Sequence, residues 1–240
     1  LPPWRSNSSK ISRVREKTAE HIRLLVADDL LQLKALCIAA FPIQYPDAWY
    51  REVVSDRTFL SYGAFRGPLM LGAIVAELKL LTNCNPEVDH SIVDSSDRWC
   101  SAPPPTVLYI LSLAVRTDER RNGVASRLLI RLLDRADCIP DGDPHSVVYT
   151  TASGETRTLA APSVVFLHVL STNTAALRFY RRHGFSRHAT LPGYYQIDFG
   201  GLVPCRTQPH PAAMAAASVR LRLRVTSLTS SGEEDRTQPS

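Results

Sequence analysis

Long hydrophobic runs are missing from this chain of 240 residues. No apolar segment approaches the roughly 18–20 residues that a helix needs to cross a bilayer. The first residues, Leu1–Arg23, are basic and rich in serine and hold no apolar core, so no signal peptide is expected. Both absences favour an intracellular protein that does not span a membrane.

Cysteine is scarce and scattered. The five cysteines never form a Cys-x-x-Cys pair, so the sequence indicates neither a zinc site nor a disulfide framework. We therefore predict reduced thiols and no metal. The cysteines are Cys37, Cys84, Cys100, Cys138 and Cys205.

Neither sign of charge dominates, because 28 Lys and Arg face 23 Asp and Glu, which leaves a net charge of +5. The excess suits an acidic partner or a membrane surface. No nucleic-acid partner is expected, because zinc-finger spacing, a basic zipper and an aromatic-rich RNA motif are all lacking. With 44% hydrophobic and 21% charged residues, the composition is that of one globular domain with tails.

The first half of the chain shows two helical patterns and then a hairpin. Apolar residues at three-to-four spacing predict a helix over Leu30–Phe41, and a Pro-Asp pair opens a second helix over Ala48–Val54. Phe59–Phe65 and Leu69–Lys79 are typical of strands joined by a tight Gly-Pro turn.

In the second half, nearly continuous apolar runs, typical of strands buried on both faces, are each followed by a helical pattern and then by late strand segments. These elements are Val107–Val115, Gly123–Ala136, Val164–Leu170, Asn173–Arg182, Phe185–His188 and Tyr194–Phe199. Strands that alternate with helices after a hairpin predict a single α/β domain, with a mixed central sheet flanked by crossover helices.

We divide the chain into a basic N-terminal arm (residues 1–21), one domain (residues 22–199) and a C-terminal tail (residues 200–240). Polar loops interrupt the domain at residues 82–106 and 137–162.

In the tail, apolar residues alternate with arginine over Val219–Val225. A period of two favours an edge strand. A basic surface-seeking segment and an unstructured tail are the alternatives.

A candidate phosphate site lies where a buried strand leads into a helix. The first N–H groups of a helix have no partner inside it and favour a negative charge. Here Gly123 allows a close approach to the backbone, Ala125 is small, and Arg120 and Arg121 add positive charge. A plain strand-to-helix connection with solvated arginines is the alternative.

This Arg-x-x-Gly-x-Ala segment resembles the acetyl-CoA signature of the GCN5-related N-acetyltransferases (GNAT superfamily). Four further segments, in the same order, resemble the protein N-terminal acetyltransferases of that superfamily: Phe41–Tyr50, Tyr109–Val115, Leu167–Tyr180 and Leu191–Tyr195. The resemblance covers residues 22–199 apart from the two polar loops. It implies the GNAT fold and acetyl-CoA as co-substrate.

The resemblance also implies roles in cofactor binding. Two residues of the buried strand would hold the pantetheine through their backbone, four residues of the turn would hold the pyrophosphate, and two residues of the last crossover helix would contact CoA. These residues are Leu113, Val115, Arg120, Arg121, Gly123, Ala125, Asn173 and Tyr180.

Tyr109 and His168 resemble the catalytic pair of the family. Only a neutral amine attacks a thioester, and imidazole takes up a proton near neutral pH. An α-amine has a pKa of about 7.7–8.0, against about 10.4 for lysine, so a histidine base suits an α-amine. Taken alone, a histidine in an apolar strand is more often a hydrogen-bonded core residue.

The resemblance assigns the acceptor peptide to an apolar pocket and to tyrosine hydroxyls that bind its backbone. The residues implied are Phe41, Pro42, Ile43, Tyr45, Tyr194 and Tyr195. Gln44 stands where the resemblance leads us to expect an acidic residue, which should weaken a preference for substrates whose second residue is basic. Gly193 replaces a tyrosine.

The implied function is therefore acetyl transfer to the α-amine of Met-initiated proteins. Acetylation of histone lysines and a non-catalytic acetyl-CoA-binding module are the alternatives. The segments resemble those of the Golgi-associated member of the family, which implies the cytoplasmic side of the Golgi membrane and peripheral membrane contact. Its C-terminal membrane-binding helices have no recognisable counterpart after Phe199.

Overall fold

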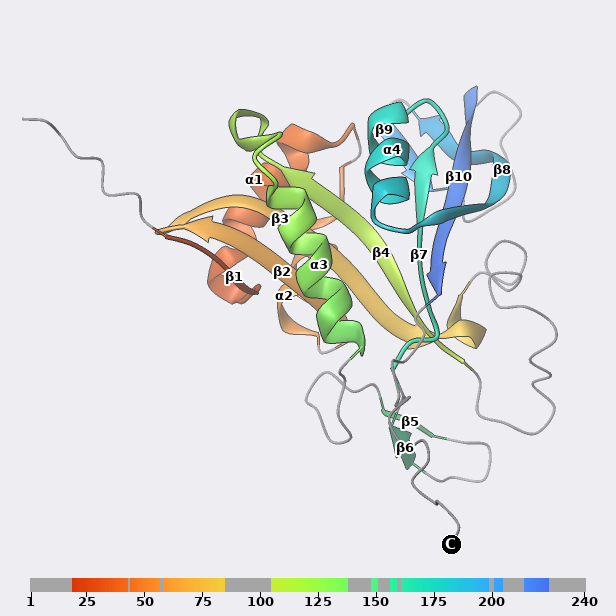
Figure 1. Cartoon of the computed structure of the whole chain (residues 1–240), viewed down its shortest axis with the longest axis horizontal. Helices are drawn as coiled ribbons and strands as arrows, with labels where there is room; N and C mark the ends of the chain where they lie inside the picture. The colour runs from red at the N-terminus through yellow and green to blue at the C-terminus, as the bar shows by residue number, and fades with distance from the viewer. Residues whose placement is uncertain are drawn as a thin grey trace, which may run out of the picture.

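The computed structural model describes residues 19–42, 44–56, 58–84, 105–137, 148–150, 156–158, 161–198, 201–204 and 214–224. An eight-stranded sheet forms its centre, in the order β1-β2-β3-β4-β7-β10-β8-β9 (Figure 1). Its strands are β1 (Glu20–Leu24), β2 (Phe59–Arg66), β3 (Leu69–Leu80), β4 (Thr106–Val115), β7 (Val164–Leu170), β8 (Ser186–Asp198), β9 (Gly201–Pro204) and β10 (Met214–Arg224). Neighbouring strands are antiparallel except β4 and β7, which are parallel.

Helices cover both faces of this sheet. Helices α1 (Leu30–Ala40) and α2 (Asp47–Ser55) pack on one face, and α3 (Val124–Asp137) and α4 (Thr174–Arg182) pack on the other. Because side chains alternate along a strand, β3 serves both layers. Ile74 joins the core under α3 and α4, whereas Val75 joins the core under α1 and α2.

The predicted helices and buried strands are confirmed, each to within one residue at either end. Their signals are strong and local: β4 and β7 are nearly continuous apolar runs, and Pro46 is the N-cap residue of α2. The predicted GNAT fold, a mixed α/β domain with helices on both faces of one sheet, is the observed architecture.

The first strand, β1, was not predicted. It begins at Glu20, inside the segment assigned to the basic arm, and pairs antiparallel with β2 from Glu20–Arg66 to Leu24–Tyr62. Only Ile22 and Leu24 of its five residues are apolar. Backbone pairing at the sheet edge stabilises this strand, so its sequence carries little hydrophobic pattern.

The C-terminal part corrects the prediction of an edge strand. β10 lies inside the sheet, between β7 and β8, and β9 is the edge. Leu221 of β10 is only 4% exposed and belongs to the core under α4. The alternation predicts a strand correctly, but it does not reveal which strands pair with it.

Two other segments differ from the prediction. The two predicted late strand segments, Phe185–His188 and Tyr194–Phe199, form one continuous strand, β8, which also includes residues 189–193 between them. A separate two-stranded sheet, β5 (Val148–Thr150) with β6 (Thr156–Thr158), lies within the second polar loop. The arm before residue 19, residues 85–104 of the first loop and the tail after Arg224 lie outside the described residues.

None of the helices in the described part of the chain is long and apolar enough to cross a membrane.

Candidate active site

Tyr109 and His168 lie side by side at the junction of the two halves of the sheet. Tyr109 Oη lies 3.1 Å from His168 Nδ1, within hydrogen-bonding distance. Tyr109 is opposite Phe166 in the β4–β7 register and stacks on its ring at 4.7 Å. His168 follows two residues later, so all three side chains share a face. The structure therefore brings together the two residues predicted as catalytic.

The parallel pairing of β4 and β7 ends beside this pair. It extends only from Val107–Val164 to Ile110–Leu167, after which the two strands diverge (Figure 1). His168 is the first residue of β7 beyond the paired stretch. The backbone of β4 beyond Ile110 keeps β3 as its neighbour on one side, while its other side faces the divergence.

A β-bulge lies in β4 at the same point. Ala76 of β3 pairs with Ile110 and Val75 pairs with Ser112, so Leu111 is an extra residue. A bulge shifts the alternation of side chains and turns backbone groups away from the regular ladder. Leu111 packs toward α1 and α2, on the face opposite Ile110.

Beyond the bulge, the two β4 residues predicted to hold pantetheine, Leu113 and Val115, direct partly buried side chains toward the α3 layer. Their side chains therefore anchor the strand in the core. This leaves the role predicted for them, contact with the cofactor, to their backbone atoms.

The β4–α3 turn, Arg120–Gly123, is exposed and has an unusual backbone. Arg121 has a φ of +69° and Gly123 a φ of +77°. A positive φ is rare outside glycine, and such strain concentrates at functional sites. Arg120 Nε donates to the carbonyl of Val115 at 3.3 Å. The turn presents cationic side chains and the N-terminus of α3, on which the predicted Ala125 is half-buried.

The two residues predicted on α4 have structural partners. Asn173 caps the helix, since its Oδ1 accepts from the N–H of Ala176 at 3.1 Å. Tyr180 is buried in the core beside Phe179 and Phe185, and this burial raises the pKa of its hydroxyl. Their contact with a cofactor stays a prediction.

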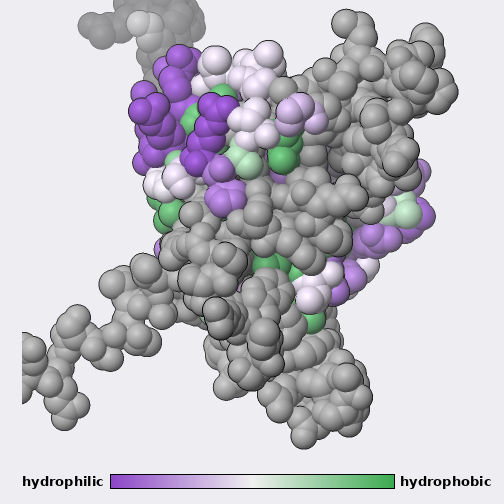
Figure 2. Space-filling model, turned by 90° about the vertical axis from the view of Figure 1, so that its right-hand side faces the viewer, coloured by the Kyte–Doolittle hydropathy of each residue, from purple (hydrophilic) through white to green (hydrophobic). Residues whose placement is uncertain are grey.

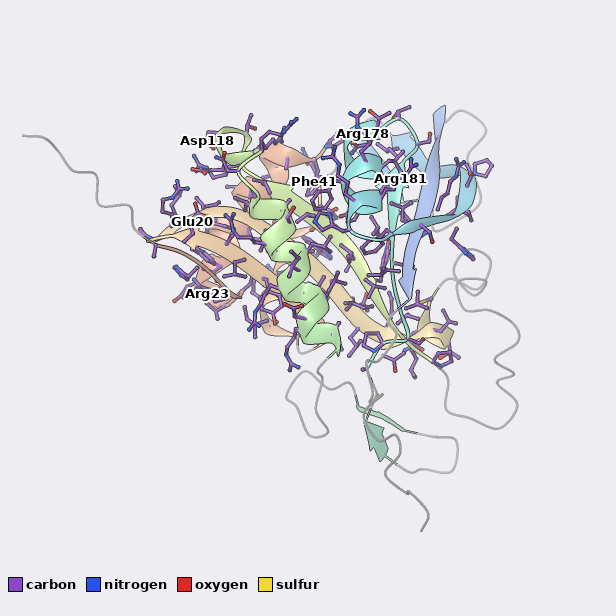
Figure 3. The ribbon with its side chains drawn as sticks, viewed as in Figure 1. Glu20, Arg23, Phe41, Asp118, Arg178 and Arg181 are labelled. Atoms are coloured by element: carbon purple, nitrogen blue, oxygen red, sulfur yellow. The ribbon has the colours of Figure 1, made fainter. Side chains whose placement is uncertain are left out.

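The outer surface of α4 is basic. Arg178, Arg181 and Arg182 are exposed, and Figure 3 shows the first two on this helix. Figure 2, which views the side of the molecule with α4, β8 and β10, shows hydrophilic residues gathered near the top. Because α3 and α4 share one face of the sheet, this charge adds to that of the β4–α3 turn.

The loop between α1 and α2 carries the predicted peptide-binding aromatics. Phe41 and Tyr45 are half-buried, with their rings edge to face at 6.3 Å. Tyr45 stacks on Trp49 at 4.1 Å, and burial raises the pKa of its hydroxyl, which therefore stays neutral. The loop packs on the same core as Leu111, the β4 residue at the bulge, two positions after Tyr109. Pro42 is exposed.

Three predicted substrate residues have no described side chain. Ile43 lies outside the described residues, and Tyr194 and Tyr195 are placed only as backbone in β8. Tyr195 is opposite Ala216 of β10 and Pro204 of β9. The prediction that all three residues contact the peptide is untested.

Sequence reasoning missed a cleft of about 400 Å³ between α1, β3 and the end of β4. Alanines of α1 open one wall, and Arg116 and Arg120 form part of the rim. It also missed Arg66 and Glu119, which bind each other beside the β4–α3 turn. A run of small residues on α1 was the available signal for the cleft, but no local pattern links Arg66 to Glu119.

In the described part of the chain, no group of three or more His, Cys, Asp or Glu could hold a metal ion. Cys37 and Cys84 are buried there, and burial raises the pKa of the Cys37 thiol to about 12.

Comparison with known proteins finds related acetyltransferases, although no protein-family model matches the chain. It is 39% identical over 178 residues to N-alpha-acetyltransferase 60 of Danio rerio, covering 73% of this chain and 63% of the relative. The same protein of Drosophila melanogaster is 34% identical over 192 residues, with equal coverage. The chain thus spans less than two thirds of the length of these relatives.

Solved structures show the same fold. Arabidopsis thaliana NAA60 in complex with acetyl-CoA superposes with a TM-score of 0.63 at 21% identity, over 86% of this chain and 99% of that one. The chain therefore has the fold of the GCN5-related N-acetyltransferases, and its predicted resemblance to their protein N-terminal acetyltransferases is confirmed.

Proposed function

We propose that the chain is a protein N-alpha-acetyltransferase that transfers acetyl from acetyl-CoA to the free α-amine of proteins beginning with Met. One observation carries this proposal: Tyr109 and His168 meet at 3.1 Å where β4 and β7 stop pairing. The similarity to N-alpha-acetyltransferase 60 supports the reaction class.

The residues around the pair fit acetyl-CoA. The positive φ values of Arg121 and Gly123 and the N-terminus of α3 form an exposed, cationic cradle for a pyrophosphate. Between this cradle and Tyr109, the backbone of Leu111–Val115 faces the divergence of β4 and β7. An extended pantetheine binds a backbone edge of this kind by hydrogen bonds, as an added strand would.

Acetyl-CoA supplies a thioester, whose carbonyl carbon a neutral amine attacks; an amide forms as the C–S bond breaks, and CoA leaves as a thiolate that becomes the thiol when His168 gives up the proton taken from the amine. His168 accepts the proton that the amine loses, directly or through an ordered water. Tyr109 holds the imidazole through Nδ1. Backbone N–H groups of β4 at the bulge stabilise the negative charge that develops on the carbonyl oxygen.

This arrangement favours an α-amine over a lysine. Deprotonating a lysine side chain requires about two to three more pKa units than an α-amine, which corresponds to roughly 3–4 kcal/mol. Phe41 and the aromatic cluster of the α1–α2 loop supply an apolar wall for the first side chain of the peptide, such as Met.

The test gives the wild-type chain acetyl-CoA with two peptides, one Met-initiated with a free α-amine and no lysine, the other α-blocked with one lysine. Mass spectrometry of fragments locates the added acetyl group. We expect modification of the free α-amine. Acetylation of only the lysine peptide would assign ε-acetylation, and acetyl-CoA binding without transfer to either peptide would assign a binding module.

We also propose, from the family resemblance and the excess of basic residues, that the chain works on the cytoplasmic side of the Golgi membrane by peripheral contact. Co-sedimentation with anionic vesicles tests that contact. A chain that stays in the supernatant at low salt would contradict it.

A further inference from the structure

Four charged side chains link the β4–α3 turn to the edge of the sheet. Arg66, at the end of β2, donates from Nη1 to Glu119 Oε1 at 2.6 Å and from Nη2 to Glu119 Oε2 at 3.0 Å. Arg66 Nη2 also donates to Glu20 Oε1 of β1 at 2.5 Å. The other oxygen of Glu20 accepts from Arg127, in the first turn of α3. We call Glu20, Arg66, Glu119 and Arg127 the edge network.

The edge network reaches the turn from both ends. Glu119 comes directly before Arg120, the first residue of the turn. Arg127 Nη1 donates to the carbonyl of Asn122 at 3.0 Å, which fixes the peptide group that joins Asn122 to Gly123. Figure 3 shows Glu20 near the edge of the sheet, below the loop that carries Asp118. The strained conformation of Arg121 and Gly123 therefore has supports on either side.

Charge within the edge network is balanced. Glu119 is only 12% exposed, and Arg66 lowers the pKa of its carboxyl group, so the carboxylate persists at neutral pH. A carboxylate beside a phosphate site repels its ligand unless a cation neutralises it. The two-bond fork of Arg66 supplies that cation, and a hydrogen bond from the Asn122 side chain ties the same carboxylate to the turn.

We propose that Arg66 and Glu119 are positioning residues for acetyl-CoA: by holding both ends of the β4–α3 turn, they preorganise its backbone for the pyrophosphate. They do not touch the cofactor; they act through Arg120–Gly123. The inference rests on the proposed function, because it assigns the turn to acetyl-CoA. It also couples β1, at the edge of the sheet, to cofactor binding.

The direction in which acetyl-CoA affinity changes when one negative charge is removed tests this inference. Glu119→Gln and Asp118→Asn each remove one negative charge from the same loop, but Asp118 pairs with Arg116, which lies outside the edge network. Simple electrostatics predicts tighter acetyl-CoA binding in both variants. Positioning predicts that Glu119→Gln alone weakens binding, by about tenfold for the loss of a charged two-bond contact.

Calorimetry gives the acetyl-CoA dissociation constant, and steady-state assays give both KM values and kcat. We expect KM for acetyl-CoA to rise in Glu119→Gln, while kcat at saturating acetyl-CoA and KM for the peptide stay within about twofold. Arg66→Lys keeps the charge without the fork and should be intermediate. It also provides a folded comparison if Glu119→Gln unfolds.

Two results would overturn the inference in different ways. A wild-type chain that binds acetyl-CoA and a Glu119→Gln variant that binds it equally or more tightly would remove the positioning role alone. A wild-type chain that does not bind acetyl-CoA would remove the proposed function, and the inference with it.

Discussion

The two halves of the sheet are connected differently. From β1 to β4, each strand lies beside the strand that precedes or follows it in the chain, whereas in the other half β10 lies between β7 and β8. Tyr109 lies on β4, the last strand of the first half, and His168 lies on β7, the neighbouring strand in the second half. The candidate active site thus joins a half whose strands lie in chain order to a half completed only by the last strand.

The comparison teaches that the catalytic pair depends on a distant segment. β10 pairs with β7 from Ser218–Leu170 to Arg224–Val164, and Arg220 is opposite His168 in the register. Without β10, β7 would lack its partner on the side away from β4. The alignment of His168 therefore depends on residues about fifty positions later in the chain.

The largest effect on stability is expected from Leu221→Ala. This substitution empties a buried position of β10, so the free energy of unfolding should fall by about 2–5 kcal/mol. Leu60→Ala, the same truncation at a buried position of β2, is the matched control in the first half and should cost a similar amount. Urea unfolding measures both. A cost below about 0.5 kcal/mol for Leu221→Ala alone would mean that β10 is not an inner strand.

A smaller effect is expected from Asp29→Asn in the first half. The Asp29 carboxylate accepts two hydrogen bonds from Arg23, at 2.6 and 2.8 Å, and one from the N–H of Val26 at 2.9 Å. Its side chain is 4% exposed, so the substitution weakens hydrogen bonds to a buried carboxylate and should cost about 1–3 kcal/mol at pH 7.

The effect of Asp29 should depend on pH. Because the hydrogen bonds from Arg23 lower the pKa of Asp29 in the folded state, its contribution is complete above the unfolded-state pKa of about 4 and is lost as pH falls further. Urea unfolding at pH 7 and near pH 3 should show the difference between wild type and Asp29→Asn shrink. The exposed Asp28→Asn is the control; a constant difference at both pH values would contradict the assignment.

The smallest effect is expected from a matched pair of glycines, one in each half. Gly123 and Gly184 have φ values of +77° and +84°, so Ala at either position should cost about 1 kcal/mol of stability. Only Gly123→Ala should also raise KM for acetyl-CoA, several-fold, because only Gly123 lies in the turn. Equal KM values for acetyl-CoA in the two variants would contradict the assignment of the β4–α3 turn to cofactor binding.

Much of the fold was predictable because its signals are local. β4 and β7 are nearly continuous apolar runs, and each is followed by a helical pattern. β1 was not predicted, because an edge strand with only two apolar residues shows little hydrophobic pattern. The position of β10 was not predicted, because a period of two indicates a strand but does not show which strands pair with it.

The candidate site divides in the same way. The residues of the β4–α3 turn are contiguous, so a helix N-terminus with glycine and arginine was enough to suggest an anion site. Tyr109 and His168 are 59 positions apart, and only the resemblance paired them before the structure did. Arg66 and Glu119, 53 positions apart, belong to none of the segments that carry the resemblance, so the contact emerged only from the fold.

Acetyl transfer from saturating acetyl-CoA to a Met-initiated peptide, compared between wild type and His168→Ala, tests the central claim most directly. Both chains must first show one cooperative thermal transition and the same dissociation constant for acetyl-CoA, and His21→Gln, remote from the pair, serves as the control. We predict that kcat/KM for the peptide falls by about 10²–10⁴ in His168→Ala and is unchanged in His21→Gln. A folded, cofactor-binding His168→Ala chain that transfers acetyl at the wild-type rate would contradict the account.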